Sequence, residues 1–403
     1  MPSVDTGLVI TPLEHSAGFG ASVSGVDLNH LSPDNFKAIE YALYKYRLLV
    51  VRDQPDLRPE SQYRINCLFD PDATGKHGHG DAKEVMKEFK GKKNLTGGLP
   101  SVPDCQMVRI VGRGTLPAGH YGTTEPIELK AGSHQAWHKT PLSDEELAGG
   151  DTRFSRWHQD AQYKPGNHTA RVTTIYAHTL PHGPDVNIRW DDGSGLTMGA
   201  KPGRTAFMDA TRMYEALSEE DRRWVDHSLV EYAPSPYEWI IACKGLSNGF
   251  GLSSDDLETP IEDLPLPESH AERLPLVWLN PVTGEKALQF HQIIVRKIHY
   301  RTSSEDEYTV IDDVREVRKM LDDLQRPFLT PSNVLIAPQE QGDLAIWLNR
   351  ACRHSPVEYP ASYGPRVMHQ CHLQGSDPVD KPWPIDGQPN PLGLVKPARA
   401  LSA

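Results

Sequence analysis

The sequence has few cysteines, no long apolar run and no secretory signal. Its five cysteines are odd in number and widely spaced, which is typical of reduced thiols rather than of a disulfide framework. No stretch approaches the roughly 18 apolar residues of a membrane helix. The first residues, Met-Pro-Ser-Val-Asp, lack the basic and apolar regions of a signal peptide. We therefore expect a cytoplasmic protein that has no membrane partner.

A surplus of positive charge is also missing. The 42 lysines and arginines are outnumbered by 54 aspartates and glutamates, which gives a formal net charge of −12. Proteins that bind the nucleic-acid backbone usually carry a basic surplus, so we expect no nucleic-acid partner. The sequence leaves open whether the chain forms a homo-oligomer.

Glycine and proline, in contrast, are abundant, with 32 and 34 residues among 403. This composition favours many short strands over long helices. Helices are expected over 32–46, 218–227 and 312–325, the first with Phe36, Ile39 and Leu43 at helical spacing. The segments expected as strands include 47–52, 105–111, 170–178, 202–209 and 239–242.

These elements predict a mainly β fold, a double-sheet jelly roll with flanking helices packed outside it. Residues 1–403 are expected to form a single domain, because no separate second domain is apparent. Residues 69–150 are interpreted as a long loop or insert region, apart from the strand at 105–111. The tail 376–403 is interpreted as a wrapping or flexible segment.

The first candidate site is the segment Trp157-His158-Gln159-Asp160. Residues i and i+2 of a strand point to the same side, so His158 and Asp160 can share one metal ion. A second histidine elsewhere would complete a facial triad with open coordination positions, as in Fe(II) oxygenases. The spacing alone is weak, because it recurs at His79-Gly80-Asp81, which we interpret as a loop. On its own, His158 would more often be a core histidine.

A second arm lies downstream in Gly342-Asp-Leu-Ala-Ile-Trp-Leu-Asn-Arg-Ala-Cys-Arg-His354-Ser355. A Gly-Asp turn, an apolar strand and a His-Ser pair make His354 the candidate third ligand. Arg366 follows twelve residues later and can reach a site at the end of the neighbouring strand. Its planar guanidinium suits a carboxylate bidentately. The alternative for Arg366 is a surface ion pair.

Together these segments resemble the TauD/TfdA family of Fe(II)/2-oxoglutarate dioxygenases. Trp157–Asp160 matches the first ligand motif of the family, and Pro202–Leu217 resembles its Gly-Asp-Thr…Tyr-Glu-Ala-Leu segment. Asn349–Ser355 and Arg366–His369 match its C-terminal pair of motifs. The resemblance covers most of residues 17–375 and implies a double-stranded β-helix.

The resemblance also implies roles for these residues. His158, Asp160 and His354 would be the catalytic residues, as ligands of Fe(II). Arg366 would bind the distal carboxylate of 2-oxoglutarate, and Thr205, otherwise a strand filler, would add a hydroxyl. With O₂, such an enzyme converts 2-oxoglutarate to succinate and CO₂ and hydroxylates a small-molecule substrate.

Gln370 bears on the choice of substrate. Taurine- and aryloxyacid-type members carry an arginine four residues after the cosubstrate arginine, where this chain has Gln370. A glutamine offers a donor and an acceptor but no charge. It argues against a sulfonate and favours a neutral heterocycle.

The middle of the chain resembles one branch of the family, the fungal xanthine/2-oxoglutarate dioxygenases, in 152–161, 232–239 and 278–289. The favoured reaction is therefore the oxidation of xanthine to uric acid. The same chemistry on a fungal secondary metabolite or a sulfonate is the alternative.

Within that branch, the resemblance implies that Gln106 and Gln370 contact substrate and that Lys139 contacts 2-oxoglutarate. His372 is a further substrate-binding candidate, because it stands where the branch has an asparagine that contacts purine. Exchanging asparagine for histidine can retune substrate choice without changing the reaction.

Two other classes of protein remain open. A zinc hydrolase could use two histidines and one aspartate, but it has no use for Arg366 or Thr205. An inactive binding module of the same fold would usually lack a metal ligand, whereas all three candidate ligands are present.

Several residues near these motifs have simpler interpretations. His77 and His79 are expected to be solvated loop residues. Tyr237 could line a pocket or fill a sheet interface. Asn349 is expected to brace the second arm rather than to bind a ligand.

Overall fold

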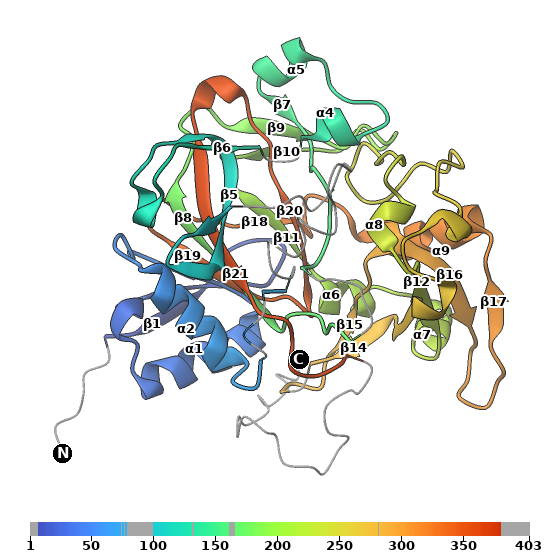
Figure 1. The fold of residues 1–403 in the computed structure, drawn as a ribbon. Coiled ribbons are helices and arrows are strands. Elements are labelled where there is room, and N and C mark those ends of the chain that lie inside the picture. Colours follow the sequence, from blue (N-terminus) through green and yellow to red (C-terminus); the bar gives the residue numbers. More distant parts are fainter. Residues whose placement is uncertain are drawn as a thin grey trace.

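The fold is built around one long sheet, seen in a computed structural model of the chain (Figure 1). The structure describes residues 7–73, 75, 77–78, 100–130, 133–160, 166–280 and 282–379. The long sheet has nine strands in the order β1-β2-β3-β19-β8-β21-β5-β4, with β6 paired to β5. Its strands are β1 Val9–Pro12, β2 Ala21–Ser24, β3 Leu48–Val51, β4 Ser101–Val102, β5 Cys105–Leu116, β6 Ile127–Leu129, β8 Val172–Thr179, β19 Leu344–Leu348 and β21 Arg366–His372.

A second sheet packs against one face of the long sheet. It has the order β18-β11-β20, with strands Leu335–Ile336, Thr205–Asp209 and Cys352–Pro356. The core between the sheets contains Phe207 of β11, Cys352 of β20 and Trp347 of β19, all inaccessible to solvent. Two sheets packed face to face bring β11, β20 and β21 close together.

The remaining strands belong to three smaller sheets, β10-β9-β7, β13-β12-β16-β17 and β14-β15. Around them lies the largest core of the molecule, which includes Trp190, Tyr232 and Phe290. The bounds of these strands are β7 Asp151–Thr152, β9 Val186–Arg189, β10 Thr197–Ala200, β12 Leu229–Tyr232, β13 Glu272–Pro275, β14 Val277–Leu279, β15 Lys286–Leu288, β16 Val295–Tyr300 and β17 Thr309–Ile311.

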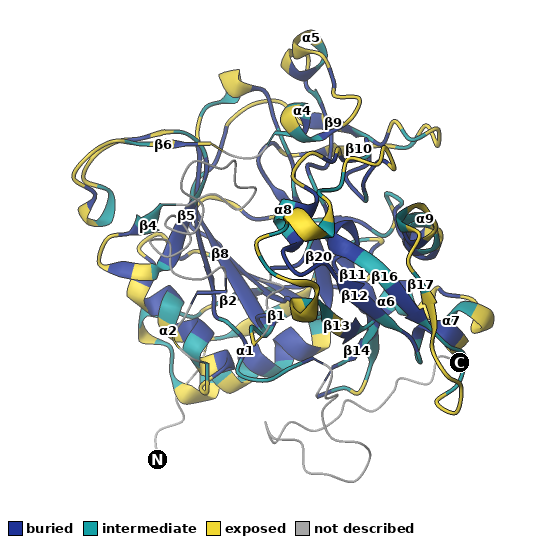
Figure 2. Ribbon diagram, turned by 45° about the vertical axis from the view of Figure 1, so that its right-hand side comes forward, coloured by how far each residue is buried: buried dark blue, intermediate teal, exposed yellow. Residues whose placement is uncertain are grey.

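Helices α1 (Pro33–Tyr46) and α2 (Pro59–Phe69) cover the opposite face of the long sheet (Figures 1 and 2). The predicted start of α1 is confirmed, because the Asn35 N–H donates to the Ser32 hydroxyl at 3.2 Å and Pro33 occupies the first turn. Leu43 of α1 is fully buried in one cluster with residues of β3 and β19. The remaining helices are α4 His134–Trp137, α5 Asp144–Ala148, α6 Ala210–Glu215, α7 Glu219–Val225, α8 Pro236–Trp239 and α9 Val314–Gln325.

Seven short 3₁₀ helices are described as well, η1 Leu28–His30, η2 His120–Gly122, η3 Ile261–Asp263, η4 Glu268–His270, η5 Gln292–Ile294, η6 Arg326–Phe328 and η7 Ala361–Tyr363. Within the described ranges, every helix is too short or too polar to cross a membrane.

The structure corrects two expectations from the sequence. Residues 239–242 do not form a strand, because Pro236 opens the short helix α8 and its last residue is Trp239. Residues 69–150 are not one long loop either, since they include β4, β5, β6, α4 and α5.

The strand predicted at 105–111 extends to Leu116 as β5 and pairs with β21 from Arg366 to Gln370. The glycine at 112 conceals this length in the sequence. A Cβ at Gly112 would come within 1.8 Å of the Arg366 carbonyl oxygen, so only glycine permits this close approach. Of the tail 376–403, only residues 376–379 lie within the described part of the chain.

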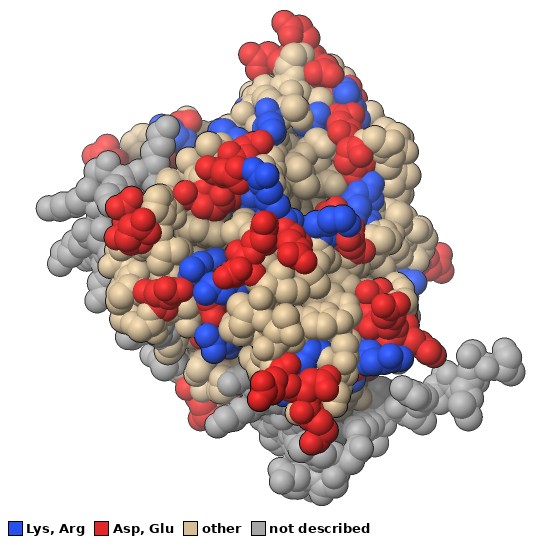
Figure 3. Space-filling view, turned by 90° about the vertical axis from the view of Figure 1, so that its right-hand side faces the viewer, with Lys and Arg blue, Asp and Glu red and all other residues tan. Residues whose placement is uncertain are grey.

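On the face shown in Figure 3, acidic and basic side chains lie next to one another over much of the surface. Ion pairs of the described residues include Arg315–Asp256, Arg318–Glu258 and Arg296–Glu268.

Candidate metal centre and cosubstrate site

His158, Asp160 and His354 converge on one point. Each offers a ligand atom, and these atoms all lie within 4.8 Å of one another. His158 Nε2 is 3.9 Å from Asp160 Oδ1, and His354 Nε2 is 3.6 Å from Asp160 Oδ2. His158 follows β7, whereas His354 lies on β20, and mutual backbone hydrogen bonds of 3.0 and 2.9 Å join the two residues. This pairing brings together residues nearly 200 positions apart in the chain.

The His158 ring is oriented by its own chain. Its Nδ1 lies 3.0 Å from the Arg156 carbonyl oxygen, which can only accept a hydrogen bond. Nδ1 therefore carries the proton and Nε2 keeps its lone pair, on the side of Asp160. Metal-binding histidines are commonly fixed in this way by a carbonyl or carboxylate behind the ring.

Asn349 fixes the backbone of Asp160. The Asp160 N–H donates to Asn349 Oδ1 at 2.8 Å, and Asn349 Nδ2 donates to the Asp160 carbonyl at 2.7 Å. Gln289 Nε2 in turn donates to the Asn349 carbonyl at 2.9 Å. Asn349 is a structural residue, as predicted, but its side chain braces Asp160 of the first arm rather than the second arm.

The surroundings of Asp160 favour a bound cation. The residue is 1% exposed, and burial raises the pKa of its carboxyl group to about 7, against the opposing effects of Thr173, Arg156 and Gln370. A nearby divalent cation would compensate this cost of desolvation. Two imidazole nitrogens and one carboxylate, converging from one side, fit an Fe(II) centre with open positions.

Arg366 and Thr205 lie next to each other at the start of β21 and β11. Arg366 Nε donates to the Gly203 carbonyl at 2.6 Å, and Nη2 donates to the Thr205 hydroxyl at 3.3 Å. Arg366 is 8% exposed, and no carboxylate of the described residues forms an ion pair with it. The alternative of a surface ion pair is therefore wrong. A buried guanidinium with an adjacent hydroxyl is suited to an incoming carboxylate.

A cavity of about 300 Å³ adjoins Arg366. Arg113, Lys130 and Tyr359 also line it. This volume suits a small molecule, and the lining mixes these cations with the carboxylates of Glu128 and Glu358. Lys130 and Arg113 were not predictable from the sequence, because neither belongs to a motif and Lys130 follows a short edge strand.

Gln370 and His372 extend along β21 to the metal site. Gln370 Nε2 lies 3.3 and 3.4 Å from the two carboxylate oxygens of Asp160. His372 Nδ1 lies 3.6 Å from Asp160 Oδ2. Both residues therefore lie beside Asp160, and their contact with substrate stays a prediction.

His77 packs on His372, with ring centroids 4.3 Å apart. It is 3% exposed, so the expectation of a solvated residue is wrong. The Gly78 N–H donates to the His372 carbonyl at 3.1 Å and holds this segment on β21. His79 and Asp81 lie outside the described residues.

The structure does not bring Lys139 or Gln106 to the triad. The Lys139 side chain is 53% exposed and pairs with Asp255 at 2.5 Å. Gln106 is an exposed residue whose Nε2 donates to the Pro103 carbonyl at 2.8 Å. The lysine that shares a cavity with Arg366 is Lys130, whereas the contact of Lys139 with 2-oxoglutarate stays a prediction. Lys139 follows the short helix α4 and Gln106 lies near the start of β5, and neither element packs its residue against the triad in a way that sequence spacing could fix.

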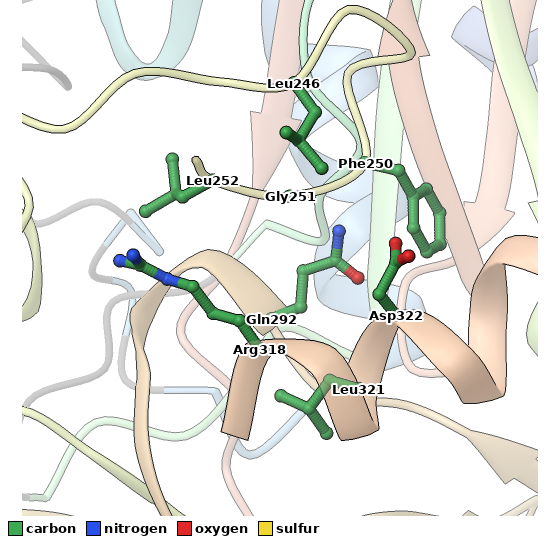
Figure 4. Close-up of a pocket in the computed structure, with 8 residues that line it drawn as sticks. All are labelled: Leu246, Phe250, Gly251, Leu252, Gln292, Arg318, Leu321 and Asp322. Carbon is green, nitrogen blue, oxygen red and sulfur yellow. The ribbon is translucent and has the colours of Figure 1, made fainter. Parts of the chain in front are cut away.

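A smaller cavity lies between the 246–252 segment and α9 (Figure 4). Its volume is about 30 Å³, enough for a water molecule but not for an organic substrate. None of the three candidate metal ligands lines it.

Comparisons with known proteins agree with this geometry. The family model described as "Taurine catabolism dioxygenase TauD, TfdA family" matches residues 10–372. An alpha-ketoglutarate-dependent xanthine dioxygenase of Emericella nidulans is 39% identical over 380 residues, which cover 94% of this chain and 99% of that protein. The alpha-ketoglutarate-dependent dioxygenase bsc9 of Alternaria brassicicola is 31% identical over 386 residues, covering 91% of this chain and 94% of that protein.

Among solved structures, AAD-2 in complex with Mn(II) and N-oxalylglycine matches with a TM-score of 0.54 and 19% identity. The match covers 92% of this chain and 99% of that one. At this identity the likeness concerns the fold alone.

Proposed function

The chain belongs to the TauD/TfdA family of 2-oxoglutarate-dependent dioxygenases, and from this premise we propose that it oxidises xanthine to uric acid. It is an oxidoreductase that uses Fe(II), 2-oxoglutarate and O₂. The observation that carries the proposal is the convergence of His158, Asp160 and His354 beside the buried Arg366–Thr205 pair. The name and 39% identity of the Emericella nidulans relative support xanthine as the substrate.

His158, Asp160 and His354 would hold the iron through Nε2, a carboxylate oxygen and Nε2. Bound Fe(II) supplies the oxidising chemistry, in which 2-oxoglutarate loses CO₂ to become succinate and one oxygen atom of O₂ enters the substrate. The Arg156 carbonyl keeps the His158 lone pair in place, and Asn349 keeps Asp160 in place. Such contacts behind the ligands fix their orientation toward the metal.

Arg366 would bind the distal carboxylate of 2-oxoglutarate, with the Thr205 hydroxyl as a further donor. The Gly203 carbonyl orients the guanidinium from behind. Arg366 is buried, so the attraction to a carboxylate is weakly screened by water. The cosubstrate thus finds a site of fixed geometry on β11 and β21.

Gln370 and His372 would contact the substrate. Gln370 already faces Asp160, and its amide can pair with a purine edge that offers both a donor and an acceptor. His372 replaces the asparagine of the xanthine-oxidising branch and is held by His77. Contacts of Gln106 or Lys139 with ligands have no support in their placement.

The test is succinate formation by the iron-loaded enzyme with 2-oxoglutarate and O₂, over a panel of xanthine, other purines, taurine and aromatic acids. Succinate stimulated by xanthine, with one uric acid formed per succinate, supports the proposal. Slow succinate formation that no purine stimulates would contradict xanthine as substrate but leave the reaction class intact. If taurine is the best substrate, the result supports the alternative of a sulfonate substrate.

A second candidate substrate is a fungal secondary metabolite, because bsc9 shares 31% identity with this chain and carries no xanthine in its name. The exchange of asparagine for histidine at 372 favours this alternative. Broadening the panel to such metabolites distinguishes the two substrates by kcat/KM. A zinc hydrolase or an inactive binding module would release no succinate at all.

The topology of the sheets and the domain organisation are also proposals. We propose that the two packed sheets form a double-stranded β-helix and that residues 1–403 are one dioxygenase domain, with a wrapping or flexible tail at 376–403. The likeness of the fold to AAD-2 over 92% of the chain supports the double-stranded β-helix and the single domain. Cytoplasmic location and the lack of nucleic-acid or membrane partners remain predictions from the sequence, which leaves the oligomeric state open. Analytical ultracentrifugation of the purified chain tests the oligomeric state.

A further inference from the structure

We propose that Arg156 binds the negative charge of the primary substrate, so that the site takes a planar organic anion rather than a neutral heterocycle. For xanthine, which has acidic ring N–H groups, the bound form is the monoanion. This inference rests on the dioxygenase activity proposed above. The uncharged Gln370 alone favours a neutral substrate, whereas Arg156 adds a positive charge near the same site.

The backbone of Arg156 is fixed beside the metal ligands. Its N–H donates to the Ser355 hydroxyl at 3.1 Å, next to His354. Its carbonyl oxygen accepts from His158 Nδ1 at 3.0 Å. Arg156 therefore cannot shift without disturbing two candidate ligands, and its side chain starts at the edge of the site.

The guanidinium lies among aromatic rings that border the triad. Its Cζ is 5.7 Å from the centre of the Trp137 ring. Tyr237 and Asp160 are the ionisable groups whose charges act on it. The rings of Tyr237 and His291 are 6.3 Å apart, and those of His291 and His158 are 6.5 Å apart. Tyr237 and His291 thus connect the surroundings of Arg156 to His158.

Arg156 has no counterion within the described part of the chain. Unlike Arg153, which pairs with Asp191, or Arg204, which pairs with Glu340, it makes no ion pair and its side chain makes no hydrogen bond. A half-buried guanidinium without a partner costs free energy unless a ligand supplies the charge. The missing partner is the observation that points to an anion.

The neighbouring groups do not supply that charge in the working enzyme. Burial raises the pKa of Tyr237 to about 12, so its phenol stays neutral near physiological pH. Asp160 is a ligand of the metal, and the cosubstrate carboxylate is matched by Arg366. Arg156 is then left positive, close enough to Asp160 for the two charges to interact. A carboxylate, or the O–C–N edge of a deprotonated purine, matches its planar donors.

The test measures binding rather than turnover, in the anaerobic enzyme loaded with Fe(II) and 2-oxoglutarate. Calorimetric dissociation constants are compared for xanthine and for hypoxanthine, a weaker acid with the same ring system. Arg156→Met should weaken xanthine binding about 10- to 100-fold, the size expected for a charge-assisted hydrogen bond. Hypoxanthine binding should change by less than about threefold. Arg156→Lys, which keeps the charge, should restore part of the loss.

Lys319→Met is the matched control, because it removes a cation whose side chain is 74% exposed and pairs with Asp323 one turn further along helix α9. It should change neither dissociation constant. Equal weakening of both purines by Arg156→Met, or no weakening, would overturn the proposal. Circular dichroism of each variant shows whether the fold is retained, and Arg156→Lys covers the case in which the methionine variant does not fold.

If the unmodified enzyme binds no xanthine, the proposed substrate fails but the role of Arg156 can still be judged. Benzoate and benzamide then serve as planar probes that differ in charge. A preference for benzoate that Arg156→Met abolishes supports the proposal. The absence of any preference for the anionic probe overturns it.

Discussion

Asn349 shows how a single residue that contacts only backbone can position a metal ligand. Its side chain exchanges hydrogen bonds with the Asp160 N–H and carbonyl, and also donates to the Ala170 carbonyl at 3.1 Å. Asn349 and Asp160 are buried, so no water replaces these bonds. The carboxylate of Asp160 is aimed at the histidines because its backbone is held.

Asn349→Ala should therefore affect both stability and iron binding. It leaves a buried N–H and two buried carbonyls without partners, which should lower the free energy of unfolding by roughly 2–4 kcal/mol. Urea denaturation measures that loss, and Fe(II) titration should show weaker binding. Asn333→Ala is the control, because Asn333 likewise bonds a backbone carbonyl but lies in the turn after η6. Unchanged iron affinity in Asn349→Ala would contradict the positioning role.

Glu40 gives the fold a pH dependence independent of the metal site. It lies on α1 and is 6% exposed, and burial raises the pKa of its carboxyl group from 4.5 to about 7. The unfolded chain ionises this group at the lower pKa, so its contribution to stability is present below about pH 4.5 and is lost as the pH rises to 7.

Glu40→Gln should remove the loss of stability that this carboxyl group causes as the pH rises. The variant should be more stable than the unmodified chain at pH 8, by up to about 3 kcal/mol, and similar to it at pH 4. Urea denaturation between pH 4 and 8 tests this. If the free energies of unfolding of the variant and the unmodified chain differ by the same amount at every pH in this range, Glu40 does not cause the pH dependence.

At the scale of elements, β21 is the strand that carries most of the site. Arg366, Gln370 and His372 are an even number of residues apart along it. Met368, which lies between them at the same spacing, packs in the core between the two sheets. Alternation along a strand puts all four side chains on one face. One strand thus bears the cosubstrate residue at its start and the residues beside Asp160 at its end.

Arg366→Ala should act on the cosubstrate. The buried site loses its only guanidinium in contact with Thr205, so the KM for 2-oxoglutarate should rise about 10- to 100-fold. The KM for xanthine should change much less. Steady-state kinetics of succinate release measure both constants. An unchanged KM for 2-oxoglutarate would place the cosubstrate elsewhere, for example against Lys130.

Gln370→Arg should act on the metal. The glutamine amide lies 3.3 Å from an Asp160 oxygen, so an arginine there would compete with the cation for the carboxylate. We expect apparent Fe(II) affinity to fall about tenfold or more, while the neutral Gln370→Leu retains binding. Equilibrium dialysis with Fe(II) compares the two variants. Equal affinities would mean that the new cation does not reach Asp160.

Elements with a strong local pattern were predictable from the sequence. The capped helix α1 and the apolar strand β3 appear where Ser32 and the run 48–51 place them. Elements that depend on a neighbour were not predictable. The length of β5 rests on pairing with β21, and the burial of His77 rests on contact with His372.

At the scale of the whole molecule, the site joins segments that are far apart in the chain. His158 and His354 are paired through their backbones, and Thr205 pairs with Pro356 on the same strand β20. Family motifs identify each segment in the sequence. They do not give the distances, because these depend on the order of strands in two packed sheets. The role of Arg156 could not be predicted from the sequence for the same reason, because the absence of a counterion shows only in the three-dimensional structure.

The central claim is that His158, Asp160 and His354 form an iron centre that couples 2-oxoglutarate oxidation to xanthine. The most direct measurement is the yield of succinate and uric acid from xanthine, together with iron content, in the unmodified chain and in His354→Ala. We predict about one iron per chain, equal amounts of the two products, and loss of both iron and products in His354→Ala. Equal turnover by His354→Ala, or iron-bound enzyme that forms no succinate with any substrate, would contradict the account.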